Sequence, residues 1–337
     1  MKHKIIPIFL FIIAPSCTCM GFDLSTQKSQ AAYSIMVNIA ECKFDSVKIA
    51  INSMIASDSC DPLGWMLLLS EISLRQLDYA RSSDSDSFQE TYERMKSVMA
   101  TYEKRSGADS YLLTIKGISQ LIAAMYTMHR KKYFAALKMG GEALDLCKEA
   151  KKIDRGNVDV EFIIGFYSYA RAELKRKFLG ILFWYSGNKQ SGIRSIENCS
   201  RNARLISPVA DMVLQEIYVK EGMYEKASAG IERILALYPS NRFALWTKAK
   251  LCDAQEMPTQ AAEVYGSLAD TYEQIPDAQK NFLATRLLEA QRYFQAKNIE
   301  KARVACDRLL AKCKGMNNDD CEEAKKLSEK ILGETNP

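Results

Sequence analysis

The chain has 337 residues, 47% of them hydrophobic, which is enough to bury the core of two ordinary domains or of one long helical stack. Its 46 basic and 41 acidic residues give a net charge of +5 that is spread along the chain, whereas nucleic-acid-binding proteins usually concentrate basic residues on one face, so we exclude that class. Only 8 prolines and 16 glycines interrupt this length, and no segment alternates in the manner of β-strands, so the composition predicts an all-α fold.

Residues 1–21 have the layout of a secretory signal. Basic residues 2–4 precede an apolar run at 5–14, which is too short to span a bilayer comfortably, and small residues follow it. We therefore expect this segment to be removed on export; the alternative is a buried N-terminal helix. Cys17 stands where the acylated cysteine of a bacterial lipoprotein signal would stand, but Ala14 replaces the leucine usual in such signals, so cleavage without lipidation stays open.

Export would allow disulfides among the ten cysteines of the chain. Cys42 and Cys60 lie beyond opposite ends of a predicted helix of about 15 residues, so about 20 Å separates them and they cannot pair. Cys313 and Cys321 flank a polar loop that a bridge between them could close. Three other cysteines lie at apolar helix positions, where we expect small buried side chains: Cys199, Cys252 and Cys306.

Helical periodicity predicts a succession of paired helices before residue 157. Asp61 and Pro62 supply an N-cap and a first-turn proline for the third of these helices, which ends at a polar run at 82–87. The other predicted helices span 27–41, 45–56, 88–105, 109–128 and 133–153.

The second half of the chain contains a recognisable repeat. The run 208–241 carries Leu214, Tyr218, Ala227, Ile231 and Pro239 at fixed offsets, with Gly222 at the turn between two helices. This pattern resembles one tetratricopeptide repeat (TPR). Further matches begin at Arg242 and near Leu283, so that the resemblance covers 208–313 well and 110–205 loosely.

The resemblance to the TPR family implies a right-handed α-solenoid of about seven helical hairpins, because one such hairpin cannot bury its own apolar face. We expect divergent hairpins over 22–157, TPR-like hairpins over 158–337, and a capping helix at 319–332. A helix followed by an aromatic loop and a Gly-rich restart, as in this chain, is also similar to TPR proteins related to eukaryotic inclusion-clearance proteins.

An apolar insertion separates two predicted helices. It reads FLGILFWY over residues 178–185 and ends in Phe183, Trp184 and Tyr185. One interpretation is a short buried segment that packs across neighbouring helices. The other is an exposed contact for a partner or a membrane surface, since basic residues precede the insertion.

Candidates for catalysis are scarce. His3 lies in the signal segment and His129 in a basic turn, and the chain lacks the short motifs of metal, nucleophile and phosphate chemistry. The sequence therefore predicts no catalytic residue, no metal site and no cofactor.

By the same family resemblance, ligands lie against the first helix of each repeat, on the concave side. Phe243 and Trp246 stand out, because an aromatic pair one turn apart suits a peptide or an apolar ligand, although packing between repeats explains the pair at least as well. The candidate positions are Met212, Glu216 and Val219, then Phe243, Trp246 and Lys250, then Leu287 and Gln291.

Together these features predict a non-catalytic scaffold or adaptor of the bacterial cell envelope, in the periplasm or at the outer membrane, that binds a peptide or a protein. The chief alternative is a periplasmic solute-binding component whose helical stack encloses a small-molecule pocket. An open groove favours the first hypothesis, and a closed apolar pocket containing 178–185 favours the second. Membrane association, peripheral or through a lipid on Cys17, is compatible with both.

Overall fold

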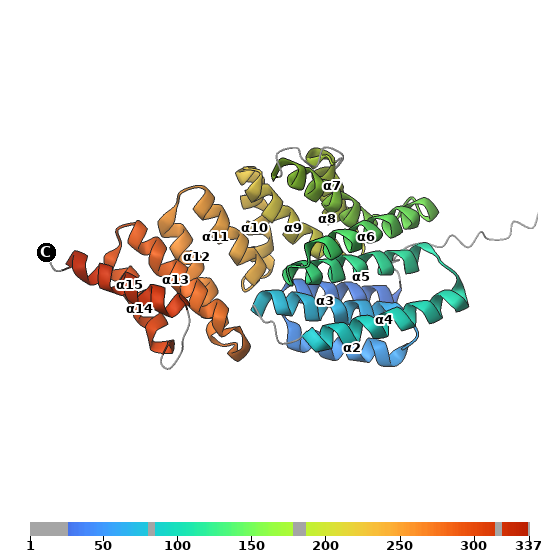
Figure 1. Cartoon of the computed structure of the whole chain (residues 1–337), viewed down its shortest axis with the longest axis horizontal. Helices are drawn as coiled ribbons and strands as arrows, with labels where there is room; N and C mark the ends of the chain where they lie inside the picture. The colour runs from blue at the N-terminus through green and yellow to red at the C-terminus, as the bar shows by residue number, and fades with distance from the viewer. Residues whose placement is uncertain (1–25, 80–84, 178–186, 314–318, 336–337) are drawn as a thin grey trace, which may run out of the picture.

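The computed structural model describes residues 26–79, 85–177, 187–313 and 319–335, and every regular element within them is helical (Figure 1). The predicted all-α fold is therefore confirmed. The signal segment with Cys17 and the insertion at 178–185 lie outside the described residues. The elements are α1 (Gln27–Ala40), α2 (Phe44–Ser57), α3 (Pro62–Tyr79), α4 (Ser85–Ser106), α5 (Ser110–His129), α6 (Tyr133–Ile153), α7 (Val160–Lys177), α8 (Lys189–Asn202), α9 (Ser207–Lys220), α10 (Tyr224–Leu237), α11 (Arg242–Ala254), α12 (Pro258–Glu273), the short 3-10 helix η1 (Pro276–Ala278), α13 (Gln279–Gln295), α14 (Ile299–Lys312) and α15 (Asp319–Thr335).

In the described part of the chain, consecutive helices pair into seven hairpins, from α1–α2 to α13–α14, and α15 packs on the last of them. Five turns inside these hairpins are built alike. One residue takes the left-handed backbone conformation, with φ between 56° and 72°, and the next amide donates to the carbonyl five residues earlier, which satisfies the end of the first helix. The left-handed residues are Cys42, Lys131, Gly222, Glu256 and Lys297. The same TPR-like turn therefore occurs in five of the seven hairpins, from α1–α2 to α13–α14.

A small repeat residue and a helix cap lie where the sequence predicts them. Ala227 has no exposed surface, as its place in the repeat requires. Between α7 and α8, a Cβ atom on Gly165 would come within 2.7 Å of the carbonyl oxygen of Gly192, so the backbones approach too closely for a side chain. The carboxylate of Asp61 accepts a hydrogen bond from the amide of Leu63 at 2.8 Å, which confirms the N-cap of α3.

The stack is not linear, because early and late hairpins also touch: α1 packs against α9, and α3 against α13. At the end of α3, the Asp78 carboxylate accepts hydrogen bonds from Nε and Nη2 of Arg242 at 2.8 and 2.5 Å, and from the hydroxyl of Tyr272 at 2.9 Å. Beside them, Nδ2 of Asn241 donates to the carbonyl of Ala40 at 3.0 Å. We call Asp78, Arg242 and Tyr272 the closing cluster. In a simple solenoid each repeat contacts only its neighbours, so this contact is an addition to the predicted fold.

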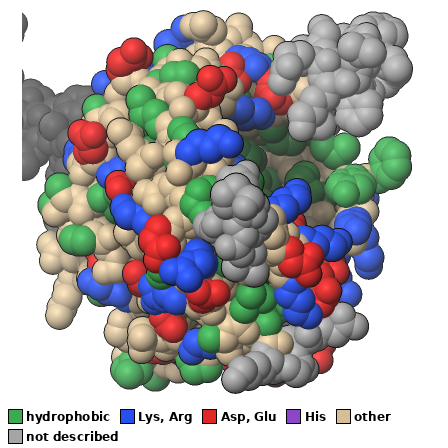
Figure 2. Space-filling model, turned by 90° about the vertical axis from the view of Figure 1, so that its left-hand side faces the viewer, with side chains coloured by type: hydrophobic (Ala, Val, Ile, Leu, Met, Phe, Trp, Pro, Cys, Tyr) green, Lys and Arg blue, Asp and Glu red, His purple; other side chains and the backbone are tan. Residues whose placement is uncertain are grey.

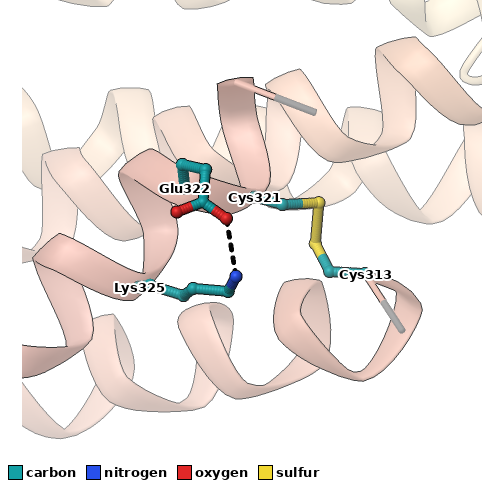
Figure 3. The surroundings of a disulfide bond; sticks show 4 residues. All are labelled: Cys313, Cys321, Glu322 and Lys325. Carbon is teal, nitrogen blue, oxygen red and sulfur yellow. Dashed lines mark hydrogen bonds and ion pairs between the residues drawn. A yellow bond between two sulfur atoms is a disulfide. The ribbon is translucent and has the colours of Figure 1, made fainter. Parts of the chain in front are cut away.

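A disulfide joins α14 to α15 (Figure 3). Cys313 and Cys321 have Cα atoms 5.9 Å apart and form the bridge that their spacing allows. The bridge fixes the start of α15, whose Ala324 and Ile331 are buried. The capping position predicted for this helix is thereby supported by both a covalent and an apolar contact. The buried free thiols include the three predicted ones, Cys199, Cys252 and Cys306.

Candidate functional site

An open groove of about 370 Å³ lies between α7, α9 and α11, the first helices of three successive hairpins. Apolar and aromatic side chains make up most of its surface, and charged side chains stand along it. The lining consists of Phe166 and Tyr169 from α7, Val213, Glu216, Ile217, Val219 and Lys220 from α9, and Lys250 from α11.

An ion pair crosses this groove. The carboxylate of Glu216 accepts a hydrogen bond from Nζ of Lys250, and each side chain is about half exposed. The two residues are 34 positions apart and occupy the same place in successive hairpins. An exposed pair of this kind contributes about 0–1 kcal/mol, so either partner can turn to an incoming charged group at little cost.

A network of charged groups around Tyr169 holds the α7 wall of the groove. The hydroxyl of Tyr169 donates to Oε1 of Glu221 at 2.8 Å, and the ammonium groups of Lys189 and Lys220 lie 5.7 and 5.2 Å from the centre of its ring. Lys189 also donates to Glu221 at 2.7 Å, and both lysines pair with the buried Glu173. Partial burial acts to raise the pKa of Glu221, but the hydrogen bonds from Lys189 and Tyr169 outweigh it and hold that pKa below its ordinary value.

The groove brings together three of the residues predicted from the sequence: Glu216, Val219 and Lys250. The aromatic pair lies elsewhere. Phe243 and Trp246 are partly buried against the core, and Nε1 of Trp246 donates to the hydroxyl of Tyr272 at 2.9 Å. The Trp246 ring also meets the edge of Tyr265 with centroids 5.9 Å apart, so this pair packs α11 on α12.

The remaining predicted positions lie outside the groove as well. Met212 is partly buried on α9, and Leu287 is buried on α13. Gln291 corresponds to Glu216 and Lys250 in the repeat, and its side chain donates to Oε1 of Glu323 in the capping helix α15 at 2.8 Å. Phe183, Trp184 and Tyr185 belong to the insertion outside the described residues.

Sequence reasoning does not single out the α7 side of the groove. Phe166 and Tyr169 are three residues apart and therefore share one face of a helix, which was an available signal. The insertion that follows α7 obscures the repeat register there, so the pair cannot be aligned with the first-helix positions of later repeats.

A second hollow, of about 290 Å³, lies between α4, α5 and α6. Its polar side chains bond to one another: the hydroxyl of Tyr92 donates to Gln120 at 2.6 Å, Gln120 donates to Glu142 at 2.5 Å, and Lys116 pairs with Glu103 at 2.8 Å. This internal pairing leaves little for a ligand to bind.

The described part of the chain has few side chains placed for catalysis or metal binding. The three charged residues that line the groove all have ion-pair partners, and His129 is exposed at the end of α5. Among the residues that the structure describes, no group of three or more His, Cys, Asp or Glu side chains could hold a metal ion. Within the same residues, none of the helices has the length and apolar character needed to cross a membrane.

The chain has similarities among proteins of known structure. The chain is similar to the C-terminal part of a TPR repeat-containing protein from Cytophaga hutchinsonii, whose crystal structure is known, with 16% identity over 88% of this chain and 98% of that one and a TM-score of 0.43. No protein-family model and no curated protein matches the chain. The hairpins themselves have TPR-like turns, with one left-handed residue and a hydrogen bond that spans five residues.

Proposed function

We propose that this protein is a non-catalytic adaptor that holds a segment of a protein or peptide in the groove between α7, α9 and α11. The observation that carries the proposal is the combination of an apolar surface with an exchangeable ion pair, Glu216–Lys250, along the first helices of adjacent hairpins. Repeat stacks commonly bind extended partners on such surfaces. Apolar side chains of the partner would enter the groove, and a charged one would replace half of the ion pair.

The open shape of the groove favours a protein segment over an enclosed solute. Small-molecule sites usually bury most of their ligand in a cavity of about 300–1,000 Å³, and this groove stands at the lower end of that range without being closed. A solute-binding protein is the second candidate, and the same capture experiment distinguishes the two.

We further propose that the protein works in the bacterial cell envelope. Residues 1–21 support export by their layout, and the Cys313–Cys321 disulfide suits an oxidising compartment. Burial keeps the Cys147 thiol unreactive there, since desolvation raises its pKa to about 12. N-terminal sequencing of the exported protein should find a start between Cys17 and Phe22, and an intact Met1 would contradict export.

The test of the binding proposal is affinity capture from envelope extract, with mass spectrometry of proteins and small molecules. Wild type is compared with Val219→Lys and Lys250→Glu in the groove, and with Val304→Lys as a control for an exposed valine on α14. A protein captured by wild type and by Val304→Lys but lost by both groove variants supports the proposal. A small molecule with that pattern supports the solute binder, and an unchanged set of captured molecules refutes the groove.

Membrane anchoring through Cys17 is a separate proposal with its own test. Cys17→Ser should release the protein from the membrane fraction if a lipid on this residue anchors it. An unchanged membrane fraction would show that no lipid at this position is needed.

A further inference from the structure

The turn between α5 and α6 exposes aromatic and basic side chains together. All residues from Met128 to Ala135 are exposed. Phe134 is 90% exposed, Tyr133 58% and Met128 46%. Three cations, at residues 130–132, lie between the methionine and the two aromatic residues. We call residues 128–134 the α5–α6 tip.

The other hairpins of the same chain show that the repeat does not require this composition. Each of the five equivalent turns has a left-handed residue, and the third residue after it stands exposed in the first turn of the second helix. In the α5–α6 hairpin this residue is Phe134. In the other four hairpins the equivalent residues are polar: Asp45, Glu225, Thr259 and Glu300.

Folding gives no reason for this exception. An acidic residue in the first turn of a helix is stabilised by the positive end of the helix dipole, and three of the four equivalent hairpins use one. A phenylalanine that is 90% exposed gains little from the core, and neighbouring lysines at a helix N-terminus are unfavourable. At the residue just before it, the α1–α2 hairpin buries Phe44 to 2% exposure, whereas Tyr133 stays 58% exposed.

The charge of the tip is uncompensated. Within the described residues, the side chains of Lys131 and Lys132 make no ion pair, and Arg130 lies over the ring of Tyr126 and donates to its hydroxyl at 3.0 Å. Further along α6, Lys138 pairs with Glu142 at 3.9 Å. Elsewhere the two signs of charge are mixed: Figure 2 shows basic and acidic side chains interspersed over the end of the molecule that carries the C-terminal helices.

We propose that the α5–α6 tip binds the surface of an anionic lipid membrane. Tyr133 and Phe134 would enter the interfacial layer, where aromatic rings are favoured, and Lys131 and Lys132 would lie among the lipid phosphates. A protein partner is the less suitable occupant, because lysine is depleted from protein interfaces and neither of the two hollows described above includes a tip residue. The proposal is independent of the groove and of any lipid on Cys17.

The test is sedimentation of the chain from Phe22 onward, which keeps every described helix, with vesicles of phosphatidylglycerol mixed into phosphatidylcholine and with vesicles of phosphatidylcholine alone. We expect the chain to bind the anionic vesicles and this binding to weaken at high salt. With phosphatidylcholine alone we expect much weaker binding or none. Phe134→Glu, which restores the residue type of the other turns, should weaken binding about tenfold. Each lysine near an anionic surface contributes about fivefold, so Lys131→Glu with Lys132→Glu should weaken it at least about twentyfold.

The matched control is Ile49→Glu, which removes an apolar side chain that is 72% exposed on α2. This variant should bind like wild type, and thermal unfolding of all variants verifies that they are folded. The proposal is overturned if wild type does not bind anionic vesicles, which is the result expected if the tip binds a protein partner instead. It is equally overturned if the tip variants bind like wild type or if Ile49→Glu loses as much binding as Phe134→Glu.

Discussion

Arg242→Met is expected to lower the free energy of unfolding by about 3–5 kcal/mol, because it leaves the Asp78 carboxylate buried without its cation. Arg242 is 7% exposed and Asp78 2%, so water cannot take the place of the guanidinium. The substitution removes two hydrogen bonds to Asp78 and one, at 3.2 Å, to the carbonyl of Cys42. Each hydrogen bond to a charged group contributes about 1.5–3 kcal/mol, but these values are not additive. The guanidinium of Arg242 lies over the rings of Tyr79 and Tyr272, and we expect the methionine to keep apolar contact with them. The expected loss of stability is therefore at the low end of the sum of these hydrogen bonds.

Urea unfolding at neutral pH measures this effect. The control is Arg233→Met, which breaks the pair between Asp211 and an arginine whose side chain is 59% exposed. Water can reach this site, so the change should cost about 1 kcal/mol. Adding Asp78→Asn to Arg242→Met should recover part of the lost stability, because it removes the unpaired buried charge. Equal midpoints for Arg242→Met and Arg233→Met would refute the view that the closing cluster joins the early hairpins to the late ones.

Three further changes test the packing, the electrostatics and the cap. Ala227 has no exposed surface, so Ala227→Leu should overpack the core and cost about 1–3 kcal/mol. Its neighbour Lys226 is exposed, so Lys226→Leu should change the thermal midpoint little. Equal shifts in the thermal midpoint would contradict the repeat register. The folded pKa of Glu221 lies below its ordinary value of 4.5, so its contribution is fully present above about pH 4.5 and is lost as the pH falls through the folded value. Glu221→Gln should therefore flatten the acid limb of the stability curve, and an unchanged limb would show that the network around Tyr169 is not formed. Replacing Cys313 and Cys321 together by serine opens a loop of 8 residues and should cost about 2.5 kcal/mol by loop entropy. The urea midpoint measures this cost, and an unchanged midpoint would show that the disulfide does not stabilise the position of α15.

The helices of this chain can be predicted because their signals are local. The predicted helix at 133–153 matches α6 at both ends, and Gly222 identifies its turn because glycine enters the left-handed region without strain. The same turn at Cys42 or Lys131 carries no such signal, because cysteine and lysine are not residue types that indicate a left-handed backbone conformation. This is why the α1–α2 and α5–α6 hairpins resemble the repeat only weakly in sequence although their turns have the same geometry.

The closing cluster and half of the groove could not be predicted in the same way. Asp78 and Arg242 are 164 residues apart, and each has the sequence context of an ordinary charged residue on a helix surface. Trp246 illustrates the opposite error, because its size and spacing suggest a ligand anchor while its indole nitrogen already bonds to Tyr272. Pairing between distant helices is set by the curvature of the whole stack, which a single sequence does not contain.

The closing cluster also bears on how the groove can bind. Arg242 begins α11, and Lys250 lies on the same helix about 12 Å further along. Because a helix is stiff over this length, fixing its first turn against α3 also fixes the groove wall that it forms. An open solenoid can flex between repeats and must lose that freedom when a partner binds, whereas a surface held in place beforehand loses less. The contact between the early and late hairpins therefore favours binding at the groove without touching the groove itself.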